Sequence, residues 1–351
     1  MSWRSEVDFA SLAASDLSFL ETRTVRQDML NLAIFGSGRW AERLVGSVQG
    51  KSDRVAFKAA ASRTPDAHRD FGEEFGLAVV SRDEAIADPA IDAVVIATAH
   101  SDHRDLAVSA AAAGKHVFVE KPLALTSADA RAMIQACDKA GVVIAHGFNR
   151  RFAPAYQDML RRLYGSEIGE LLHLEGQFSG PSGYMLKPGM WRAERAECPA
   201  GAMTARGIHA LDAMIAMAGP VKTVYCHSET RVLPVDVDDV TSALLRFASG
   251  ATGYIASHHA TGEIWRLQVY GSKGWMEMRG DGDLLIRTLG NEPEAIAMAP
   301  LDKERAELEA FADAVAGSRP YPVTNAQALN GIAVIEAMVA SAVSGAPQSI
   351  R

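Results

Sequence analysis

Two side chains in this sequence have the chemistry and the setting to move a proton. Lys121 stands between Glu120 and Pro122, directly after an apolar stretch typical of a strand. A lysine partly withdrawn from water there has a lowered pKa, and its cation stabilises negative charge on a nearby oxygen. His209 lies near the start of an apolar helix, with Asp212 on the same face, where the carboxylate is expected to orient the imidazole. The alternatives are a surface lysine and a histidine satisfied by a backbone carbonyl.

A glycine-rich turn near the start of the chain predicts a nucleotide site. It follows the apolar residues 30–35 and consists of Gly36, Ser37, Gly38, Arg39 and Trp40. Gly36 permits a tight turn, Gly38 lets backbone N–H groups approach a pyrophosphate, and Ala41 lets the next helix pack closely on its strand. The helix N-terminus adds unpaired N–H groups and partial positive charge. The turn therefore predicts a dinucleotide cofactor.

The end of the second predicted strand bears on which dinucleotide is bound. NAD-specific sites usually place a carboxylate about 20 residues after the glycines, where it accepts the ribose 2′-hydroxyl. Here the strand runs into Ser62 and Arg63 without an acidic residue. Arg63 is suited to pair with a 2′-phosphate, Ser62 to donate a further hydrogen bond, and Arg39 to add positive charge. We expect NADP, with NAD as the second candidate; the alternative for Arg63 is a solvated loop residue.

The elements that position these residues alternate between strand and helix. Further strands are predicted at 55–61, 91–98, 115–119 and 142–145, and helices at 67–75, 102–113 and 128–140. This alternation predicts an α/β unit with right-handed crossovers and a parallel sheet, in which ligands bind beyond the carboxyl ends of the strands. We expect residues 29–149 to form a Rossmann dinucleotide-binding domain.

After residue 150 the apolar pattern changes to a period of two. Such stretches occur at 171–177, 221–232, 240–247, 252–257, 265–270, 275–278 and 284–288, with helices expected at 208–217, 303–316 and 326–343. We expect residues 150–351 to form one α+β substrate and oligomerisation domain with a large, mostly antiparallel, open-faced sheet. Large apolar residues on the outer face favour a homodimer or homotetramer. They are Tyr225, Tyr254, Ile255, Trp265 and Tyr270.

Six motifs in order resemble one family, the Gfo/Idh/MocA oxidoreductases, over nearly all of residues 29–351. The motifs are Gly36-Ser-Gly-Arg-Trp-Ala41, Ile96-Ala-Thr-Ala-His-Ser-Asp-His103, Ala113-Gly-Lys-His-Val-Phe-Val-Glu-Lys-Pro122, Gly147-Phe-Asn-Arg-Arg-Phe152, Gly207-Ile-His-Ala-Leu-Asp212 and Tyr270-Gly-Ser-Lys-Gly274. The resemblance implies a Rossmann domain followed by a domain with an open antiparallel sheet. It also implies hydride transfer between NAD(P) and a sugar, a polyol or a related carbonyl or hydroxyl compound.

The resemblance assigns roles to further residues. Cofactor contacts are expected from Thr98, Ala99, His100, His103, Glu120, Lys121 and Asn149, in addition to the glycine turn, Ser62 and Arg63. Substrate contacts are expected from Arg151, Trp191, Arg192 and Arg206. The Lys121–Pro122 bond is expected to be cis. No metal is expected, because His100 and His103 lack further ligands nearby.

One departure from the family pattern lies at Ala205. Many dehydrogenases of this family carry a carboxylate there, so the set of Lys, Asp and His is incomplete in this chain. Thr204 and Arg206 are candidate substitutes, and Arg206 favours an acidic or phosphorylated substrate. Two alternatives stay open beside a dehydrogenase. One is a related hydrolase that opens a glycosidic bond by transient oxidation, and the other is a silent dinucleotide-binding protein.

Composition narrows the class of protein. The chain has 351 residues and a net charge of −8 without a basic run, which argues against a nucleic-acid partner. Three widely spaced cysteines, Cys137, Cys198 and Cys226, favour a reducing compartment. No apolar stretch approaches about 18 residues, so no membrane span is expected. Residues 1–28 lack the features of an export signal and are interpreted as an extension or a misannotated start; we expect a cytoplasmic location.

Overall fold

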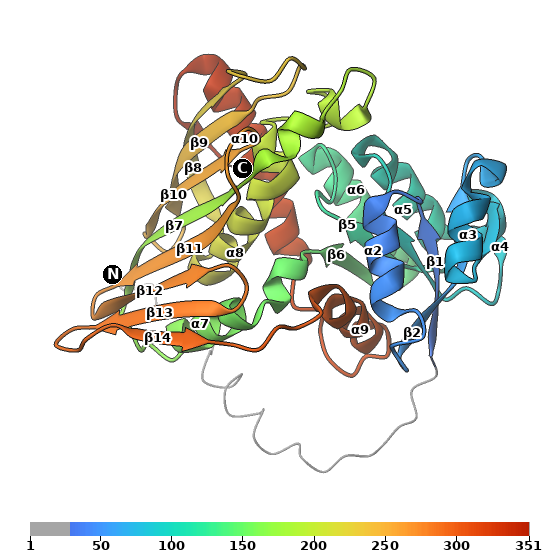
Figure 1. Cartoon of the computed structure of the whole chain (residues 1–351), viewed down its shortest axis with the longest axis horizontal. Helices are drawn as coiled ribbons and strands as arrows, with labels where there is room; N and C mark the ends of the chain where they lie inside the picture. The colour runs from blue at the N-terminus through green and yellow to red at the C-terminus, as the bar shows by residue number, and fades with distance from the viewer. Residues whose placement is uncertain (1–28, 351) are drawn as a thin grey trace, which may run out of the picture.

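The computed structural model describes residues 29–350 (Figure 1), so the predicted extension at 1–28 lies outside the described residues. The first half of that range forms a six-stranded parallel sheet in the order β3-β2-β1-β4-β5-β6. Its strands are β1 (Leu30–Phe35), β2 (Val55–Ser62), β3 (Ala78–Ser81), β4 (Ala93–Ile96), β5 (His116–Glu120) and β6 (Ile144–Gly147). The chain order reverses between β1 and β4, and in such sheets this point marks the ligand crevice.

Helices connect these strands and pack on the sheet. They are α2 (Arg39–Val48), α3 (Arg69–Phe75), α4 (Arg82–Ala87), α5 (His103–Ala112) and α6 (Ser127–Ala140). Local sequence sets their ends: the Thr126 side chain caps α6, and Gly141 ends it in the left-handed conformation at φ 68°. A late helix, α9 (Lys303–Val315), returns to this layer and packs Phe311 against Phe118, with ring centroids 5.7 Å apart.

The second half forms a nine-stranded sheet within the described range, in the order β14-β13-β12-β11-β7-β10-β9-β8-β15. All of its pairings are antiparallel except that of β7 with β10. Its strands are β7 (Leu171–Ser179), β8 (Val221–Glu229), β9 (Val240–Phe247), β10 (Thr252–His258), β11 (Ile264–Gly271), β12 (Gly274–Arg279), β13 (Asp283–Thr288), β14 (Glu294–Ala297) and β15 (Gln348–Ser349). The predicted fold class, a Rossmann-like parallel sheet followed by a mostly antiparallel one, is confirmed.

Three helices accompany the second sheet: α7 (Pro154–Tyr164), α8 (Ile208–Ala218) and α10 (Asn325–Ser344). Every residue of α8 is buried, and the helix packs on β7. Helix α10 contacts α8 and β8 on one side and α6 of the first layer on the other, so it ties the two layers together (Figure 1).

Helix α10 also corrects one expectation from the sequence. By length and composition alone it is apolar enough to cross a membrane, whereas no such stretch was expected. Its buried residues include Ile332, Val334, Ile335 and Met338, which lie in the two hydrophobic cores of the protein. Packing inside the fold therefore accounts for its apolar composition.

The outer face of the nine-stranded sheet differs in part from the prediction. Tyr225, Leu244 and Tyr254 lie side by side across β8, β9 and β10, and Leu244 and Tyr254 are exposed. Ile255 and Trp265 are buried in the core instead. The reason is the period of two: neighbouring residues of a strand point to opposite faces, so Tyr254 and Ile255 cannot share one.

Candidate active site

The glycine turn has the geometry that a dinucleotide needs. Gly36 has φ 109°, and a Cβ there would lie 2.5 Å from the carbonyl oxygen of Ala97, so no other residue fits without distortion. Gly38 is the N-cap of α2 without a side-chain cap, and a Cβ there would meet no protein atom within 4 Å. The first-turn N–H groups of α2 therefore stay free for a phosphate, and the turn fits the pyrophosphate of a dinucleotide.

The end of β2 carries the two residues predicted to select the dinucleotide. The side chain of Arg63 is 73% exposed, and its Nη2 lies 3.9 Å from Oδ2 of Asp102. Ser62 Oγ accepts a hydrogen bond from the Thr64 N–H at 3.1 Å. Asp102 is held by Arg82 at 2.8 Å. The structure therefore brings a carboxylate to a place where the sequence around Ser62 offered none.

Lys121 spans the boundary between the two sheets. Its Nζ donates a hydrogen bond of 2.7 Å to the backbone carbonyl of Ala205, which lies just before α8. The Lys121–Pro122 bond is cis, as expected. Burial lowers the pKa of Lys121 to about 8, although the neighbouring Glu120 acts in the opposite direction. A lysine with this pKa exchanges a proton readily near neutral pH.

Behind Lys121 lies a group of buried carboxyl side chains. Oε2 of Glu120 accepts a hydrogen bond from the Lys121 N–H at 3.2 Å, and burial raises the pKa of Glu120 to about 7. Gly147 makes room for it, since a Cβ there would lie 2.7 Å from Oε1 of Glu120. Glu307 of α9 is fully buried with both oxygens unpartnered, and burial beside Glu120 and Glu304 raises its pKa well above the ordinary value. Burial without a hydrogen-bond partner therefore favours the neutral, protonated form of Glu307.

His209 faces the same boundary from α8. Its ring lies between Phe148 and Phe178, with centroid distances of 5.8 and 5.9 Å. Nδ1 is buried without a hydrogen-bond partner among the described residues. Burial, together with the positive charges of Lys121, Arg150 and Arg206, holds the pKa of His209 well below its usual value. The imidazole is neutral at pH 7 and able to accept a proton.

Asp212 does not orient His209, which corrects the sequence prediction. Both of its oxygens accept hydrogen bonds from Arg151, Oδ2 from Nε at 2.5 Å and Oδ1 from Nη2 at 2.9 Å. Both side chains are 4% exposed. Arg151 therefore holds α8 in place and does not reach a substrate. A buried carboxylate needs a charged partner, and the imidazole could not have supplied a permanent one.

The two histidines of the predicted cofactor loop have supporting positions. His103 is fully buried, and its Nδ1 lies 3.0 Å from the carbonyl oxygen of Pro122. His100 pairs through Nδ1 with the carbonyl of Glu197 at 2.6 Å and packs edge-on against Trp191 at 4.8 Å. Both contacts of His100 join the first layer to the segment that carries Trp191. His103 thus supports the Lys121–Pro122 bond, and Thr98 and Ala99 lie on the loop that leads to it.

Asn149 and Trp40 complete the floor of the cleft on the first layer. Asn149 donates a hydrogen bond of 2.9 Å to Glu304, while its Oδ1 is buried without a partner. Trp40 Nε1 is buried as well, and it interacts with the Glu120 carboxyl, which opposes the rise in the pKa of that group. Ser37 Oγ pairs with Nδ1 of His68 at 2.6 Å, which fixes the turn between the two glycines. Unpartnered polar atoms at a ligand crevice are typical of groups that wait for a ligand or a water.

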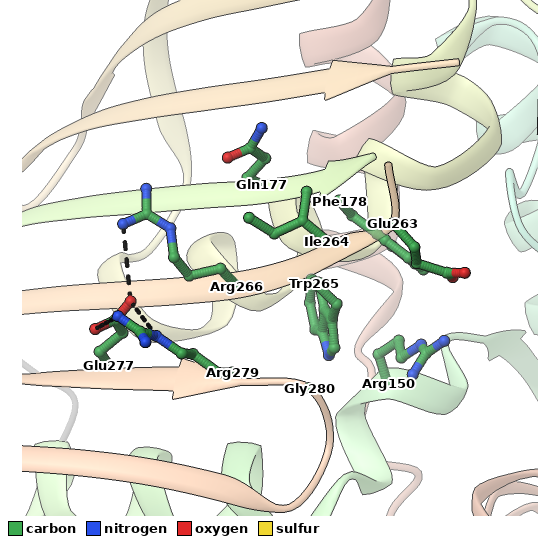
Figure 2. Close-up of a pocket in the computed structure, with 10 residues that line it drawn as sticks. All are labelled: Arg150, Gln177, Phe178, Glu263, Ile264, Trp265, Arg266, Glu277, Arg279 and Gly280. Carbon is green, nitrogen blue, oxygen red and sulfur yellow. Dashed lines mark hydrogen bonds and ion pairs between the residues drawn. The ribbon is translucent and has the colours of Figure 1, made fainter. Parts of the chain in front are cut away.

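Two arginines share one aromatic ring on the side of the second sheet. The guanidinium groups of Arg150 and Arg206 lie 5.0 and 5.2 Å from the ring centroid of Phe178. Arg150 and Phe178 also line a cavity of about 760 Å³, which Figure 2 shows with Trp265 and Glu263 at the same end. Arg192 lies 4.0 Å above the ring of Trp191, on the neighbouring segment.

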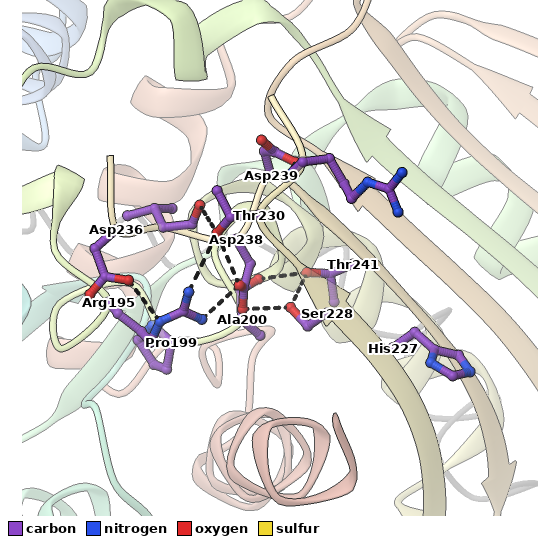
Figure 3. A network of polar contacts seen from close by, with 12 residues as sticks. Arg195, Pro199, Ala200, His227, Ser228, Thr230, Asp236, Asp238, Asp239 and Thr241 are labelled. Atoms are coloured by element: carbon purple, nitrogen blue, oxygen red, sulfur yellow. Dashed lines mark hydrogen bonds and ion pairs between the residues drawn. The ribbon is translucent and has the colours of Figure 1, made fainter. Parts of the chain in front are cut away.

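A polar network fixes the loop that leads to Arg206 and His209 (Figure 3). Arg195 pairs with Asp238 at 2.6 Å and with Asp236 at 3.2 Å. Ser228 donates a hydrogen bond to Asp238 at 2.8 Å, and Thr241 donates one to the carbonyl of Ala200 at 3.0 Å. The residues after this loop, Met203–Gly207, form a single wide π-type turn before α8. Such turns often occur at functional sites because they re-aim side chains.

Sequence reasoning missed Arg150, Phe178, Glu263 and Glu307 in this region. Two adjacent arginines, Arg150 and Arg151, gave no signal as to which one faces the cleft. Among residues 29–350 no group of three or more His, Cys, Asp or Glu side chains is placed to hold a metal. Taken together, the glycine turn fits a dinucleotide, and Lys121 and His209 lie near each other where the two layers meet.

Comparisons with known proteins agree with this geometry. Residues 30–148 match the Gfo/Idh/MocA oxidoreductase family, NAD-binding Rossmann fold, and residues 156–277 match the Gfo/Idh/MocA C-terminal domain. The scyllo-inositol 2-dehydrogenase (NAD(+)) of Bacillus subtilis is 31% identical over 78% of this chain and 78% of its own length. The D-xylose 1-dehydrogenase (NADP(+)) 2 of Haloferax volcanii is 27% identical over 88% of this chain and 96% of its own.

A solved structure shares both layers. The aldose-aldose oxidoreductase of Caulobacter crescentus, crystallised with glycerol, is 28% identical and superposes with a TM-score of 0.82 over 92% of this chain and 99% of its own. The match extends across the first sheet and the second, and so across the crevice between them.

Proposed function

This chain belongs to the Gfo/Idh/MocA oxidoreductase family and binds a nicotinamide dinucleotide, and from that premise we propose how its residues act on a sugar or polyol. Bound nicotinamide supplies the acceptor or donor of a hydride. The chain's own residues hold the reacting oxygen and manage its proton. The observation that supports the proposal is the hydrogen bond of Lys121 to Ala205, in the turn that leads into His209, which brings the Lys121 charge near enough to lower the pKa of His209.

In the direction of oxidation, a carbinol must lose its hydroxyl proton as the hydride leaves its carbon. Lys121 has Nζ at the boundary, where its charge stabilises the developing alkoxide. Neutral His209 accepts the proton through Nε2. In the reverse direction the same two residues return a proton to the carbonyl oxygen.

Residues 29–149 supply the dinucleotide site in this proposal, and residues 150–351 supply the substrate side. NADP is the favoured dinucleotide, because Arg63 is exposed beside Ser62 and no carboxylate follows β2 directly. Asp102 reduces the expected preference for NADP, because its Oδ2 lies 3.9 Å from Nη2 of Arg63. A 2′-phosphate competes with Asp102 for the Arg63 guanidinium.

Net oxidation–reduction is favoured over the two alternatives. The relatives compared above are named as dehydrogenases or oxidoreductases, not hydrolases. A silent binder is disfavoured because Lys121 and His209 are both present and lie near each other between the two layers. We also propose a cytoplasmic enzyme that forms a homodimer or homotetramer through the outer face of the nine-stranded sheet, where Leu244 and Tyr254 are exposed.

The proposal is tested by a turnover screen. The purified full chain is incubated with NAD+ or NADP+ and a panel of aldoses, inositols and polyols, and reduction of the dinucleotide is followed by absorbance. Substrate-dependent reduction is expected for at least one compound. Binding of the dinucleotide without turnover of any compound, in either direction, contradicts the proposal and supports the silent binder.

A further inference from the structure

The charged side chains that act on His209 are all positive. Lys121, Arg150 and Arg206 all lie near enough to disfavour its protonation, and no carboxylate among residues 29–350 opposes them with a comparable effect. Position 205, next to Arg206, is an alanine whose carbonyl already accepts the Lys121 ammonium. A reactant beside His209 therefore lies near three cationic side chains, Lys121 from the first layer and Arg150 and Arg206 beside the ring of Phe178.

Arg206 is built into place there. Its Nε donates to Ser182 Oγ at 3.2 Å, and its Nη1 lies 3.4 Å from the carbonyl of Ser179. Gly180 leaves room for it, because a Cβ there would lie 2.6 Å from Nη1. The side chain is 21% exposed, and its Nη2 donates to no residue of the described range. One edge of the guanidinium is thus fixed by the protein and another edge remains open.

The carboxylate that pairs with Arg206 is exposed to solvent, and the carboxylate that pairs with Arg150 is shared with Lys303. Nη1 of Arg206 pairs with Glu263 at 3.2 Å, but Glu263 is 68% exposed, and such surface pairs are worth about 1 kcal/mol or less. Arg150 pairs with Asp281, which also takes Lys303 at 2.8 Å. Arg150 and Arg206 meet at the ring of Phe178, which itself packs against His209. A ligand anion can displace the exposed carboxylate and gain two guanidinium partners.

We infer that the substrate is an anionic sugar or polyol, whose carboxylate or phosphate is held by Arg206 and Arg150 while its reacting hydroxyl lies beside Lys121 and His209. This rests on the proposed function and narrows it. Guanidinium groups bind both kinds of anion with paired hydrogen bonds, so the two share one recognition chemistry. The relatives named above are dehydrogenases of neutral compounds, inositol and xylose, so this chain differs from them in substrate class.

The experiment compares matched substrates with the full chain and its preferred dinucleotide. The pairs are D-glucose with D-glucuronate and D-glucose 6-phosphate, D-galactose with D-galacturonate, and D-glucitol with D-gluconate. At least one anionic member is expected to exceed its neutral parent in kcat/KM by tenfold or more, with the advantage shrinking as ionic strength rises. Comparison of the sugar acids with the sugar phosphate shows whether the protein binds a carboxylate or a phosphate.

Two variants are expected to change the KM for the anionic substrate in opposite directions. Arg206→Gln should raise KM for the anionic member at least tenfold more than for its neutral parent, with a smaller effect on kcat. Glu263→Gln should lower KM for the anionic member, because it removes the competing carboxylate, and this variant keeps the test valid should Arg206→Gln misfold. Arg161→Gln removes an exposed charge on α7 and is the matched control, expected to change neither KM.

Two other outcomes are informative: one overturns the inference alone, and the other overturns the proposed function. Neutral sugars turned over as well as or better than their acids and phosphates, with Glu263→Gln lacking any effect, overturn the inference and leave the proposed function standing. Absence of dinucleotide-linked turnover for both neutral and anionic compounds overturns the proposed function, and the inference falls with it.

Discussion

The Nζ of Lys121 lies 2.7 Å from the backbone carbonyl oxygen of Ala205, so a residue at the end of the parallel sheet is hydrogen-bonded to the turn that starts the buried helix of the second layer. This contact joins the two layers at the place where the chemistry is expected. An ammonium group has three N–H donors, so this bond fixes the direction of Lys121 and leaves two donors for a reacting oxygen.

Arg63 should set the dinucleotide preference. NADPH is expected to bind more tightly than NADH, because the exposed guanidinium offers a charge-assisted partner to the 2′-phosphate. Arg63→Ala should weaken NADPH binding by roughly tenfold to a hundredfold and NADH binding much less, the scale of one charged hydrogen bond. Dissociation constants from nucleotide fluorescence test this, with Arg69→Ala as the control. Tighter binding of NADH to the unaltered protein contradicts the assignment.

The outer sheet face should form the contact between copies of the chain. Light scattering at micromolar concentration is expected to give the mass of a dimer or tetramer. Tyr254→Glu places a charge among Tyr225 and Leu244 and should shift the mass toward the monomer. Leu289→Glu, at an exposed leucine in the turn after β13, is the control. A monomeric mass for the unaltered protein removes this proposal.

Glu307 should give stability a distinctive pH dependence. Its pKa is raised on folding, so its contribution to stability is fully present below the unfolded pKa of about 4.3 and is lost as pH rises. Glu307→Gln replaces the protonated acid with an amide that does not titrate. The Tm of the variant minus that of the unaltered protein should therefore increase from pH 5 to pH 8.

The size of this effect is bounded, since one group contributes at most about 1.4 kcal/mol per pH unit. Glu73→Gln, on the exposed side of α3, is the control variant for the exchange of a glutamate for a glutamine. Thermal unfolding across this pH range provides the measurement. A difference that stays flat or falls for Glu307→Gln would show that Glu307 is ionised in the folded protein.

Gly201 should be indispensable to the loop before Arg206. It has φ 50°, and a Cβ there would lie 1.7 Å from the carbonyl oxygen of Asp238. Gly201→Ala is expected to destabilise the protein by about 3–5 kcal/mol. Gly141→Ala, also at positive φ but with open space around it, should cost only about 1–2 kcal/mol. Denaturant unfolding of both variants measures this, and equal losses contradict the steric argument.

The sequence predicted the architecture because its signals were local. The run from Leu30 to Ala41 carried the strand, the turn and the helix, and the period of two identified the strands of the second sheet that are long enough to show it. Strands β3, β14 and β15 were missed. They have four, four and two residues, which is too short for an alternation of apolar and polar residues to be recognised. Helices α4 and α7 were also missed.

Contacts between distant segments were not predictable from local patterns. Asp212 and His209 share a helix face, but the partner of Asp212 proved to be Arg151, from another element. Asp102 reaches Arg63 because the fold brings the residues after β4 next to the end of β2, and Glu307 lies near Glu120 because α9 returns to the first layer. The positions of Lys121 and His209 followed from motifs, whereas the arginines around Phe178 needed the structure.

Lys121 and His209 together manage the proton of the reacting oxygen while the hydride is transferred at its carbon. Steady-state kinetics of Lys121→Ala and His209→Ala, with the best substrate from the turnover screen, test it most directly, beside the dinucleotide dissociation constants of the same variants. Each variant should lose roughly a hundredfold or more in kcat/KM, the scale of a positioned acid or base, while dinucleotide affinity changes far less. Near-normal turnover in both variants contradicts the account and removes the pair from the mechanism.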